Sequence, residues 1–171
     1  MKLAARIGLI LLGIIALLIV VLAIVGVVNV RRPFPDTDTT LTLPGLQDEV
    51  NVYRDENGIP HIYAQNEHDL FLAQGYVTAQ DRFWQMDFWR HTGSGRLSEM
   101  FGEGQLDTDK YLRTLGWARV AQMELQGLDQ QTLDILQAYA DGVNAYLADH
   151  QGSALSLEYA VLKLLNPSYK P

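Results

Sequence analysis

The chain has 171 residues, a net charge of −7 at neutral pH and no cysteine. Its length allows one domain of ordinary size. The acidic residues concentrate after residue 40, because the first forty residues hold four basic side chains against two acidic ones. This balance argues against a nucleic-acid-binding protein, which shows a basic patch or stripe. The lack of cysteine excludes disulfides, thiolate metal sites and a thiol nucleophile within these residues.

The first segment of the chain, Ile7 to Val28, contains no charged residue. As a helix it would span about 33 Å, enough for the roughly 30 Å hydrocarbon core of a bilayer. Lys2 and Arg6 precede it, so a cleaved signal peptide is the alternative interpretation. The apolar stretch is longer than the roughly 7–15 residues of a signal-peptide core, and no A-x-A cleavage site follows. We therefore predict an uncleaved transmembrane signal-anchor.

The charges around this anchor, residues 1–32, give a weak orientation signal. Basic residues before the apolar segment favour a cytoplasmic N-terminus, whereas Arg31 and Arg32 after it reduce the bias. We expect a single pass through the cytoplasmic (inner) membrane, with the body on the extracytoplasmic, periplasmic side.

Residues 33–44 are predicted to be a polar spacer that leads into a first strand. We expect three strands, at Thr40–Leu43, Glu49–Asp55 and Ile59–Ala64. Asn57-Gly58 between the last two predicts a type I′ hairpin turn, which needs positive φ at both central residues. Pro60 cannot donate a hydrogen bond to the sheet, so the return strand should lie near an edge.

From Asn66 onwards the pattern is helical. Asn66 is a good N-cap, and Glu67 and Asp69 in the first turn favour the helix dipole. The predicted helices run from Asn66 to about His91 with a stop at Gly93 and Gly95, from Arg96 to Phe101, from a cap at Asp107 or Thr108 to Leu115, on to about Leu125 after a break at Gly116, and from a cap at Asp129 to Gly152.

The long helix around Gly75–Arg90 has two apolar stripes on roughly opposite sides. One stripe consists of Leu70, Ala73, Val77, Trp84 and Phe88, and the other of Leu72, Tyr76, Ala79, Phe83 and Met86. A helix with two such stripes must be covered from both sides. Asp81 lies close to the first stripe, where an unpaired carboxylate is costly. We therefore expect a buried helix with an internal ion pair, and Arg96 can pair with either Asp81 or Glu99.

The residues alone do not assemble an active site. The histidines, none of them at a metal-like spacing with nearby acids, are His61, His68, His91 and His150. The acid groups Glu103/Asp107/Asp109 and Asp48/Glu49 are typical of helix caps and a solvated loop. There is no G-x-S-x-G elbow, P-loop or dinucleotide fingerprint. We expect no metal site and no catalytic residue, and the substrate-binding residues are not identified.

Several motifs in order are more specific than any one of them. They are Val52–Ala64 (VYRDENGIPHIYA), Gly75–Asp87 (GYVTAQDRFWQMD), Gly95–Glu99 (GRLSE), Leu136–Ala145 (LQAYADGVNA) and Asn166–Pro171 (NPSYKP). This series resembles the start of the penicillin acylase (penicillin amidase) family, over about residues 45–171.

The resemblance implies an N-terminal nucleophile hydrolase of αββα fold. In that family a precursor (zymogen) cuts itself into a small α chain and a large β chain, whose new N-terminal residue, usually serine, attacks an amide carbonyl. The free α-amine of that residue acts as the general base, and oxyanion-hole donors lie in the β chain. Many members bind calcium through β-chain oxygens and one acid late in the α chain.

None of these functional residues can be assigned to a position here. Gly93-Ser94 ends the central helix, and Gly152-Ser153 leads into a helical pattern, whereas the family serine opens a β strand. Glu158 lies upstream of the landmark at Pro171, whereas the calcium acid lies beyond that landmark. We expect residues 45–171 to be the N-terminal, incomplete part of an α-chain domain without its own nucleophile or cofactor; calcium is implied for the full-length protein only.

The sequence thus predicts an α+β fragment of a membrane-anchored amidohydrolase, inactive alone. Its expected substrates are linear amides, such as a β-lactam side chain or an N-acyl homoserine lactone, and Arg96-Leu-Ser-Glu favours the first. Its expected partners are the remaining α-chain segment and the β chain of the same precursor, a small-molecule amide and the membrane, but no nucleic acid. The alternative is a small membrane-anchored helical module that binds a partner and catalyses nothing.

Overall fold

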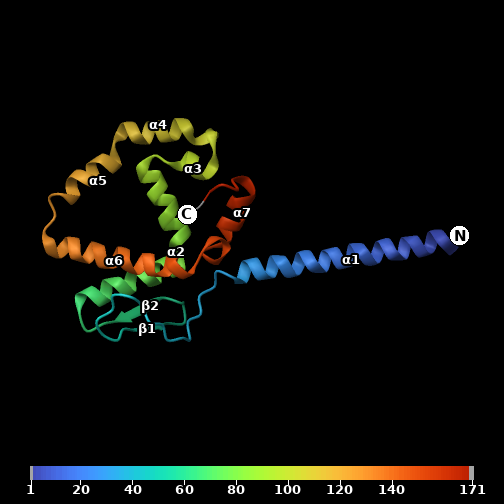
Figure 1. Cartoon of the computed structure of the whole chain (residues 1–171), viewed down its shortest axis with the longest axis horizontal. Coiled ribbons are helices and arrows are strands. Elements are labelled where there is room, and N and C mark those ends of the chain that lie inside the picture. Colours follow the sequence, from blue (N-terminus) through green and yellow to red (C-terminus); the bar gives the residue numbers. More distant parts are fainter. Residues whose placement is uncertain (1, 170–171) are drawn as a thin grey trace.

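The computed structural model describes residues 2–169, with side chains from residue 7 onwards. The chain consists of one long N-terminal helix, a β-hairpin and a mainly helical body (Figure 1). The elements are α1 (Lys2–Arg31), β1 (Asn51–Arg54), β2 (Pro60–Tyr63), α2 (Glu67–Ser94), α3 (Leu97–Phe101), the 3₁₀ turn η1 (Glu103–Gln105), α4 (Leu106–Leu115), α5 (Trp117–Leu125), α6 (Gln130–Asp149), the 3₁₀ turn η2 (Gly152–Ala154) and α7 (Leu157–Leu165). The predicted α+β class with its hairpin and helical body is confirmed.

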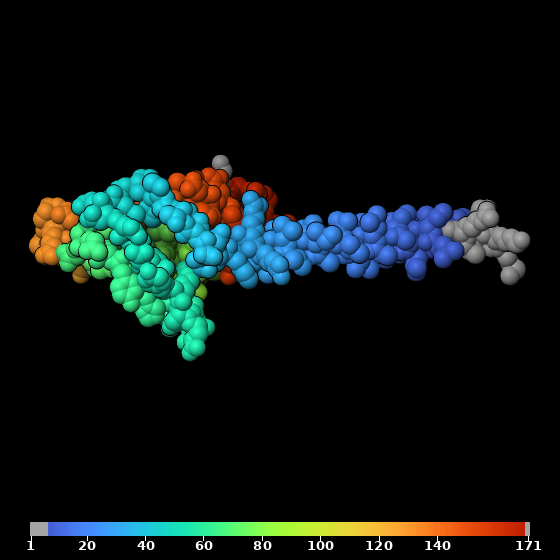
Figure 2. Space-filling view, turned by 90° about the horizontal axis from the view of Figure 1, so that it is seen from below, coloured from blue at the N-terminus to red at the C-terminus, as the bar shows by residue number. Residues whose placement is uncertain are grey.

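Helix α1 extends away from the body as a single rod (Figures 1 and 2). From Ile7 to the end of α1, the apolar side chains of the helix are exposed. By length and composition, Ile7–Arg31 can cross a membrane.

The hairpin pairs β1 with β2 in antiparallel register, with Val52 opposite Ile62. The predicted type I′ turn is wrong, because among the described residues only glycines have positive φ, so Asn57 does not. Gly58 alone adopts the left-handed conformation (φ 76°), and its N–H donates to the Asp55 carbonyl. The Asp55 carboxylate also accepts the N–H groups of Asn57 and Ile59. These bonds favour a three-residue loop with a bulge at Gly58.

The first predicted strand, Thr40–Leu43, is wrong, because these residues have no regular secondary structure. Pro44 follows it and has no N–H to donate, and it restricts the backbone of Leu43. Both later strands were predicted too long, since pairing is limited to Asn51–Arg54 and Pro60–Tyr63.

Helix α2 is the centre of the body, and α6 is its main neighbour (Figure 1). The two backbones approach very closely at two glycines. A Cβ added at Gly75 would overlap the carbonyl oxygen of Tyr139, and one added at Gly142 would overlap that of Leu72. Both predicted stripes of α2 contribute to the core, since Ala73 and Val77 of the first and Leu72, Ala79 and Phe83 of the second are buried.

A kink divides α2 at Arg82, which has non-helical dihedral angles (φ −142°, ψ 21°). No proline or glycine lies within six residues of it, so the sequence carries no signal for the kink. On both sides of this kink α2 packs with α3, α6 and α7 in a cluster made of Ala79, Phe83, Met100, Tyr146, Leu155, Tyr159 and Leu162.

Most helix boundaries follow the predictions, but α6 ends at Asp149, three residues before the predicted stop at Gly152. Asn66 accepts the N–H of Asp69, Asp129 accepts that of Thr132, and Gly95 ends α2 in a left-handed conformation. Helix α4, however, begins at Leu106 without a side-chain cap, so neither Asp107 nor Thr108 has the predicted role.

Candidate functional site

An arginine from the hairpin connects β1 to the helix just before its kink. The Arg54 guanidinium donates two parallel hydrogen bonds to Asp81, of 2.8 and 2.9 Å, from Nη2 and Nη1. It also donates to the Gln80 side chain (2.9 Å) and to the carbonyl of Gly58 in the turn (3.0 Å). Such bidentate pairing adds geometric specificity to the ionic attraction.

This pair corrects the predicted role of Asp81. The carboxylate is ion-paired, but its side chain retains 24% of its exposed area, so it is not a buried charge. Its partner comes from the hairpin, because Arg96 bonds with Glu99 instead, at 2.7 and 2.6 Å. The hydrogen bond with Glu99 raises the pKa of Arg96.

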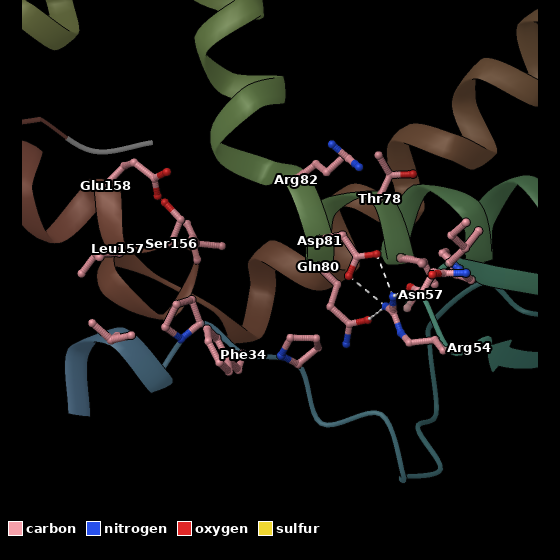
Figure 3. A pocket seen from close by; sticks show the side chains of 18 residues that line it. Phe34, Arg54, Asn57, Thr78, Gln80, Asp81, Arg82, Ser156, Leu157 and Glu158 are labelled. Atoms are coloured by element: carbon pink, nitrogen blue, oxygen red, sulfur yellow. Dashed lines mark hydrogen bonds and ion pairs between the residues drawn. The ribbon is translucent and has the colours of Figure 1, made fainter. Parts of the chain in front are cut away.

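The Arg54–Asp81 pair forms one wall of a cleft of about 690 Å³ (Figure 3). The chain after α1, including Phe34, lies along the cleft, and Ser156, Leu157 and Glu158 at the start of α7 line the opposite side. The Ser156 hydroxyl is buried and has no hydrogen-bond partner among residues 7–169.

Asp87, in the second half of α2, is a buried carboxylate that the sequence patterns did not indicate. Its side chain is fully enclosed, at 1% relative exposure. Tyr159 and Tyr169 donate to Oδ2 at 2.8 and 2.6 Å, and Arg90 donates to Oδ1 at 2.7 Å. His91 Nδ1 lies 3.1 Å from Oδ1 and donates to the Asp87 backbone carbonyl at 2.8 Å.

These partners keep Asp87 ionised despite its burial. Desolvation alone would raise its pKa, but the hydrogen bonds from Tyr169, Arg90 and Tyr159 outweigh it and lower the pKa. Burial, together with the charge of Asp87, raises the pKa of both tyrosines. A carboxylate so saturated with donors has no free lone pair for a substrate proton. We therefore assign Asp87 a structural role, joining α2 to α7 and to Tyr169.

Two other buried acids hold loop and helix backbone. Asp69 accepts the N–H groups of Gln47 and Asp48 and the Asn66 amide, and His68 Nδ1 lies 3.0 Å from it. Desolvation opposes ionisation of Asp69, but the bonds from His68, Gln47 and Asn66 prevail and lower its pKa from 3.8 to about 2.

Asp109 plays the same part at the start of α3. It accepts the N–H groups of Leu97 and Ser98 and the Ser98 hydroxyl, so it caps α3 from another helix. Burial would raise its pKa, but these bonds lower it.

The histidines are dispersed and each has a local partner. His61 lies 3.5 Å from Asp55, His150 donates to the Tyr146 carbonyl, and His68 and His91 contact the acids already described. Within residues 7–169 no group of three or more histidine or acidic side chains is placed to hold a metal.

The two Gly-Ser pairs lie apart from each other and from any general base among the described side chains. The Ser94 hydroxyl donates to the Arg90 carbonyl at 2.5 Å within α2. The Ser153 hydroxyl, in η2, accepts a hydrogen bond from Arg32 at 3.3 Å. Glu158 is exposed in the first turn of α7.

This arrangement of helices and hairpin has a counterpart among known proteins. The model of the penicillin amidase family matches residues 49–171. The chain therefore belongs to the penicillin amidase family.

The similar proteins include two kinds of acylase. The chain is 41% identical over 132 residues to penicillin acylase 2 proenzyme of Pseudomonas sp. (strain SE83), covering 77% of this chain and 17% of that protein. It is 36% identical over 113 residues to acyl-homoserine lactone acylase QuiP of Pseudomonas aeruginosa, covering 66% and 13%. Thermostable penicillin G acylase from Alcaligenes faecalis superposes with a TM-score of 0.62 at 31% identity, covering 72% of this chain and 64% of that chain. The chain thus spans less than a fifth of the length of these two curated relatives.

Proposed function

We propose that this chain is the N-terminal, membrane-tethered scaffold of an amidohydrolase that cleaves linear amides. The observation that carries the proposal is the family match over residues 49–171. The substrate class is a β-lactam side chain or an N-acyl homoserine lactone, since both penicillin acylases and acyl-homoserine lactone acylases are among the relatives. Helix α1 holds the body at the outer face of the cytoplasmic membrane.

In this proposal the nucleophile belongs to a partner polypeptide of the same precursor, together with the remaining α-chain segment. The word proenzyme in the name of one relative agrees with such processing. One feature of the chain supports a missing partner. Several large apolar side chains are more than half exposed, namely Trp89, Tyr111, Trp117 and Met123.

An activity assay with two preparations tests the proposal. The chain purified alone should release no chromophore from phenylacetyl or longer acyl amides. The complete gene product, isolated from its own cells, should hydrolyse at least one of them and contain a polypeptide with an N-terminal serine. Turnover by the chain alone would refute the assigned division of labour. A complete gene product without any amidase activity would favour the partner-binding module instead.

A further inference from the structure

Helix α7 is apolar on two faces, and only one of them is covered. Tyr159 and Leu162 are buried in the core cluster. The opposite face has a stripe that we call the α7 stripe, composed of Leu157, Val161, Leu164 and Leu165. Leu164 and Leu165 are 82% and 76% exposed, more than the apolar side chains of α4 and α5. A helix with two apolar faces needs a second apolar neighbour.

The position of α7 identifies that neighbour. It contacts α1, and the adjoining turn η2 bonds to the end of α1 through Arg32 and Ser153 (3.3 Å). Both views show α7 at the end of the body from which α1 leaves, and Figure 1 shows its axis running across that of α1. If α1 spans a bilayer, α7 therefore lies along the plane of the membrane surface.

The depth of α7 also fits the membrane interface. A hydrocarbon core of about 30 Å is filled by the segment up to about Val28, so the next residues lie among the lipid headgroups. Asn29 and Arg32 of this level line one cleft together with Lys163 and Leu164 of α7. Arg31, Arg32 and Lys163 are exposed cations at this level, and the neighbouring Phe34 is 69% exposed. Cations attract anionic headgroups, and aromatic side chains are enriched at this depth.

We propose that the α7 stripe rests on the bilayer as an interfacial helix, so that α1 and α7 together fix the orientation of the body. The occupant of this surface is the lipid interface, because the stripe continues the lipid-facing surface of α1 and is bordered by cations. Helix α5 lies at the far side of the body from α1 (Figure 1), so its exposed apolar side chains are beyond the reach of the same bilayer. The inference rests on the proposed membrane anchor.

Spin labels can measure the depth of α7 directly, because the chain has no cysteine of its own. Single variants Leu164→Cys and Val161→Cys would be labelled in the complete protein, after any cysteine outside residues 1–171 has been replaced by serine, and reconstituted in vesicles of phosphatidylethanolamine and phosphatidylglycerol. The matched control is Met123→Cys, an exposed apolar position on α5. Leu18→Cys in the middle of α1 reports on the anchor itself. The measurement is collision with oxygen, which enters lipid, relative to a water-soluble nickel chelate.

We expect the ratio of oxygen collisions to nickel-chelate collisions at Leu164 and Val161 to exceed that at Met123 by at least about threefold. The ratio should rise because the α7 labels insert into the headgroup–acyl boundary. A deep label at Leu18 with aqueous labels on α7 would overturn this inference and leave the anchor standing. An aqueous label at Leu18 would refute the anchor first. Labels on α7 that are shielded from both reagents would show that protein covers the stripe, which also overturns the proposal.

Discussion

Asp87 has four partners and no contact with solvent, so its charge depends on them. Replacing it with alanine would leave Arg90 and two tyrosine hydroxyls without their acceptor. We expect Asp87→Ala to lower the free energy of unfolding by about 2–5 kcal/mol, because two tyrosine hydroxyls lose a charged acceptor at about 1–3 kcal/mol each. Urea unfolding followed by circular dichroism would measure it. The control is Asp107→Ala, an exposed acid paired only with Lys110, which should change stability by no more than about 0.5 kcal/mol.

Tyr159→Phe separates hydrogen bonding from packing at this site. It removes one donor to the carboxylate and keeps the ring, so we expect an intermediate loss of about 1.5–3 kcal/mol in the same urea titration. Equal stability of Tyr159→Phe and the wild type would show that the Asp87 carboxylate does not depend on this bond.

Asp69 should make stability dependent on acid pH. Its pKa is about 2 in the folded chain against 3.8 for the free group, so the unfolded chain binds more protons between these values. The stabilisation is complete above about pH 5 and is lost as the pH falls towards 2. The difference in thermal midpoint between wild type and Asp69→Asn should therefore shrink over this range. A constant difference from neutral pH down to the acid limit would contradict the assigned role of the charge.

The Arg54–Asp81 pair is partly exposed, so its contribution should be smaller than that of Asp87. A double-mutant cycle with Arg54→Ala and Asp81→Ala should give a coupling energy of about 1–2 kcal/mol, given two parallel charged hydrogen bonds reduced by solvent screening. Urea unfolding of the four proteins measures it. The Arg96–Glu99 pair, which is more exposed, is the matched comparison and should couple by less than 1 kcal/mol, roughly the limit for surface pairs.

Among single residues, the sequence patterns pointed to Asp81 as the acid of a buried ion pair, whereas in the structure Asp87 is the enclosed carboxylate. Asp81 lies near an apolar stripe, but the hairpin supplies its partner and water reaches it. Asp87 has its tyrosine partners 72 and 82 positions further along the chain. The periodicity of one helix carries no information about contacts over such separations. This buried network could therefore be identified only from the three-dimensional structure.

Elements are held together by the close approach of α2 and α6. An added methyl group at Gly142 has no space, because the obstacle is the backbone carbonyl of Leu72. We expect Gly142→Ala to destabilise the chain by about 3 kcal/mol or more, the upper range of overpacking, since backbone must move.

Gly93→Ala is the matched control for this substitution. No atom lies within 4 Å of a Cβ placed at Gly93, and alanine favours helix by about 1 kcal/mol. The control should therefore be neutral or stabilising in the same urea titration. Equal effects of the two substitutions would refute the backbone contact as the cause.

Elements were predictable where the signal is local. Asn66 and Asp129 cap helices with their own side chains, and Gly95 and Gly116 end helices by conformational freedom, as their positions in the sequence indicate. The prediction of the turn type was wrong because the Asp55 carboxylate, which accepts the N–H of Asn57, determines the loop geometry there. The cap of α3 is equally non-local, since Asp109 reaches it from α4.

The molecule as a whole exposes apolar side chains on α4 and α5 that the proposed partner would cover. In a lipid nanodisc, the chain without partner should bind a hydrophobic dye. Replacing Trp117 and Met123 with glutamine should reduce dye binding without lowering the thermal midpoint, because both side chains are exposed. Leu112→Gln is the contrasting variant, since Leu112 is buried and its loss should unfold the region. Unchanged dye binding in the double variant would place the apolar surface elsewhere.

Under the proposed export with α1 as anchor, the contact between α2 and α6 would also set the order in which the body folds. Leu72 and Gly142 are about 70 positions apart in the chain. If α1 is held in the membrane as proposed, α2 would leave the translocation channel first, and both its apolar faces would stay uncovered until α6 follows. At roughly 5–20 residues per second this delay is about 4–14 s, long enough for aggregation to compete with folding. A periplasmic chaperone that recognises α2 would therefore act before the body is complete.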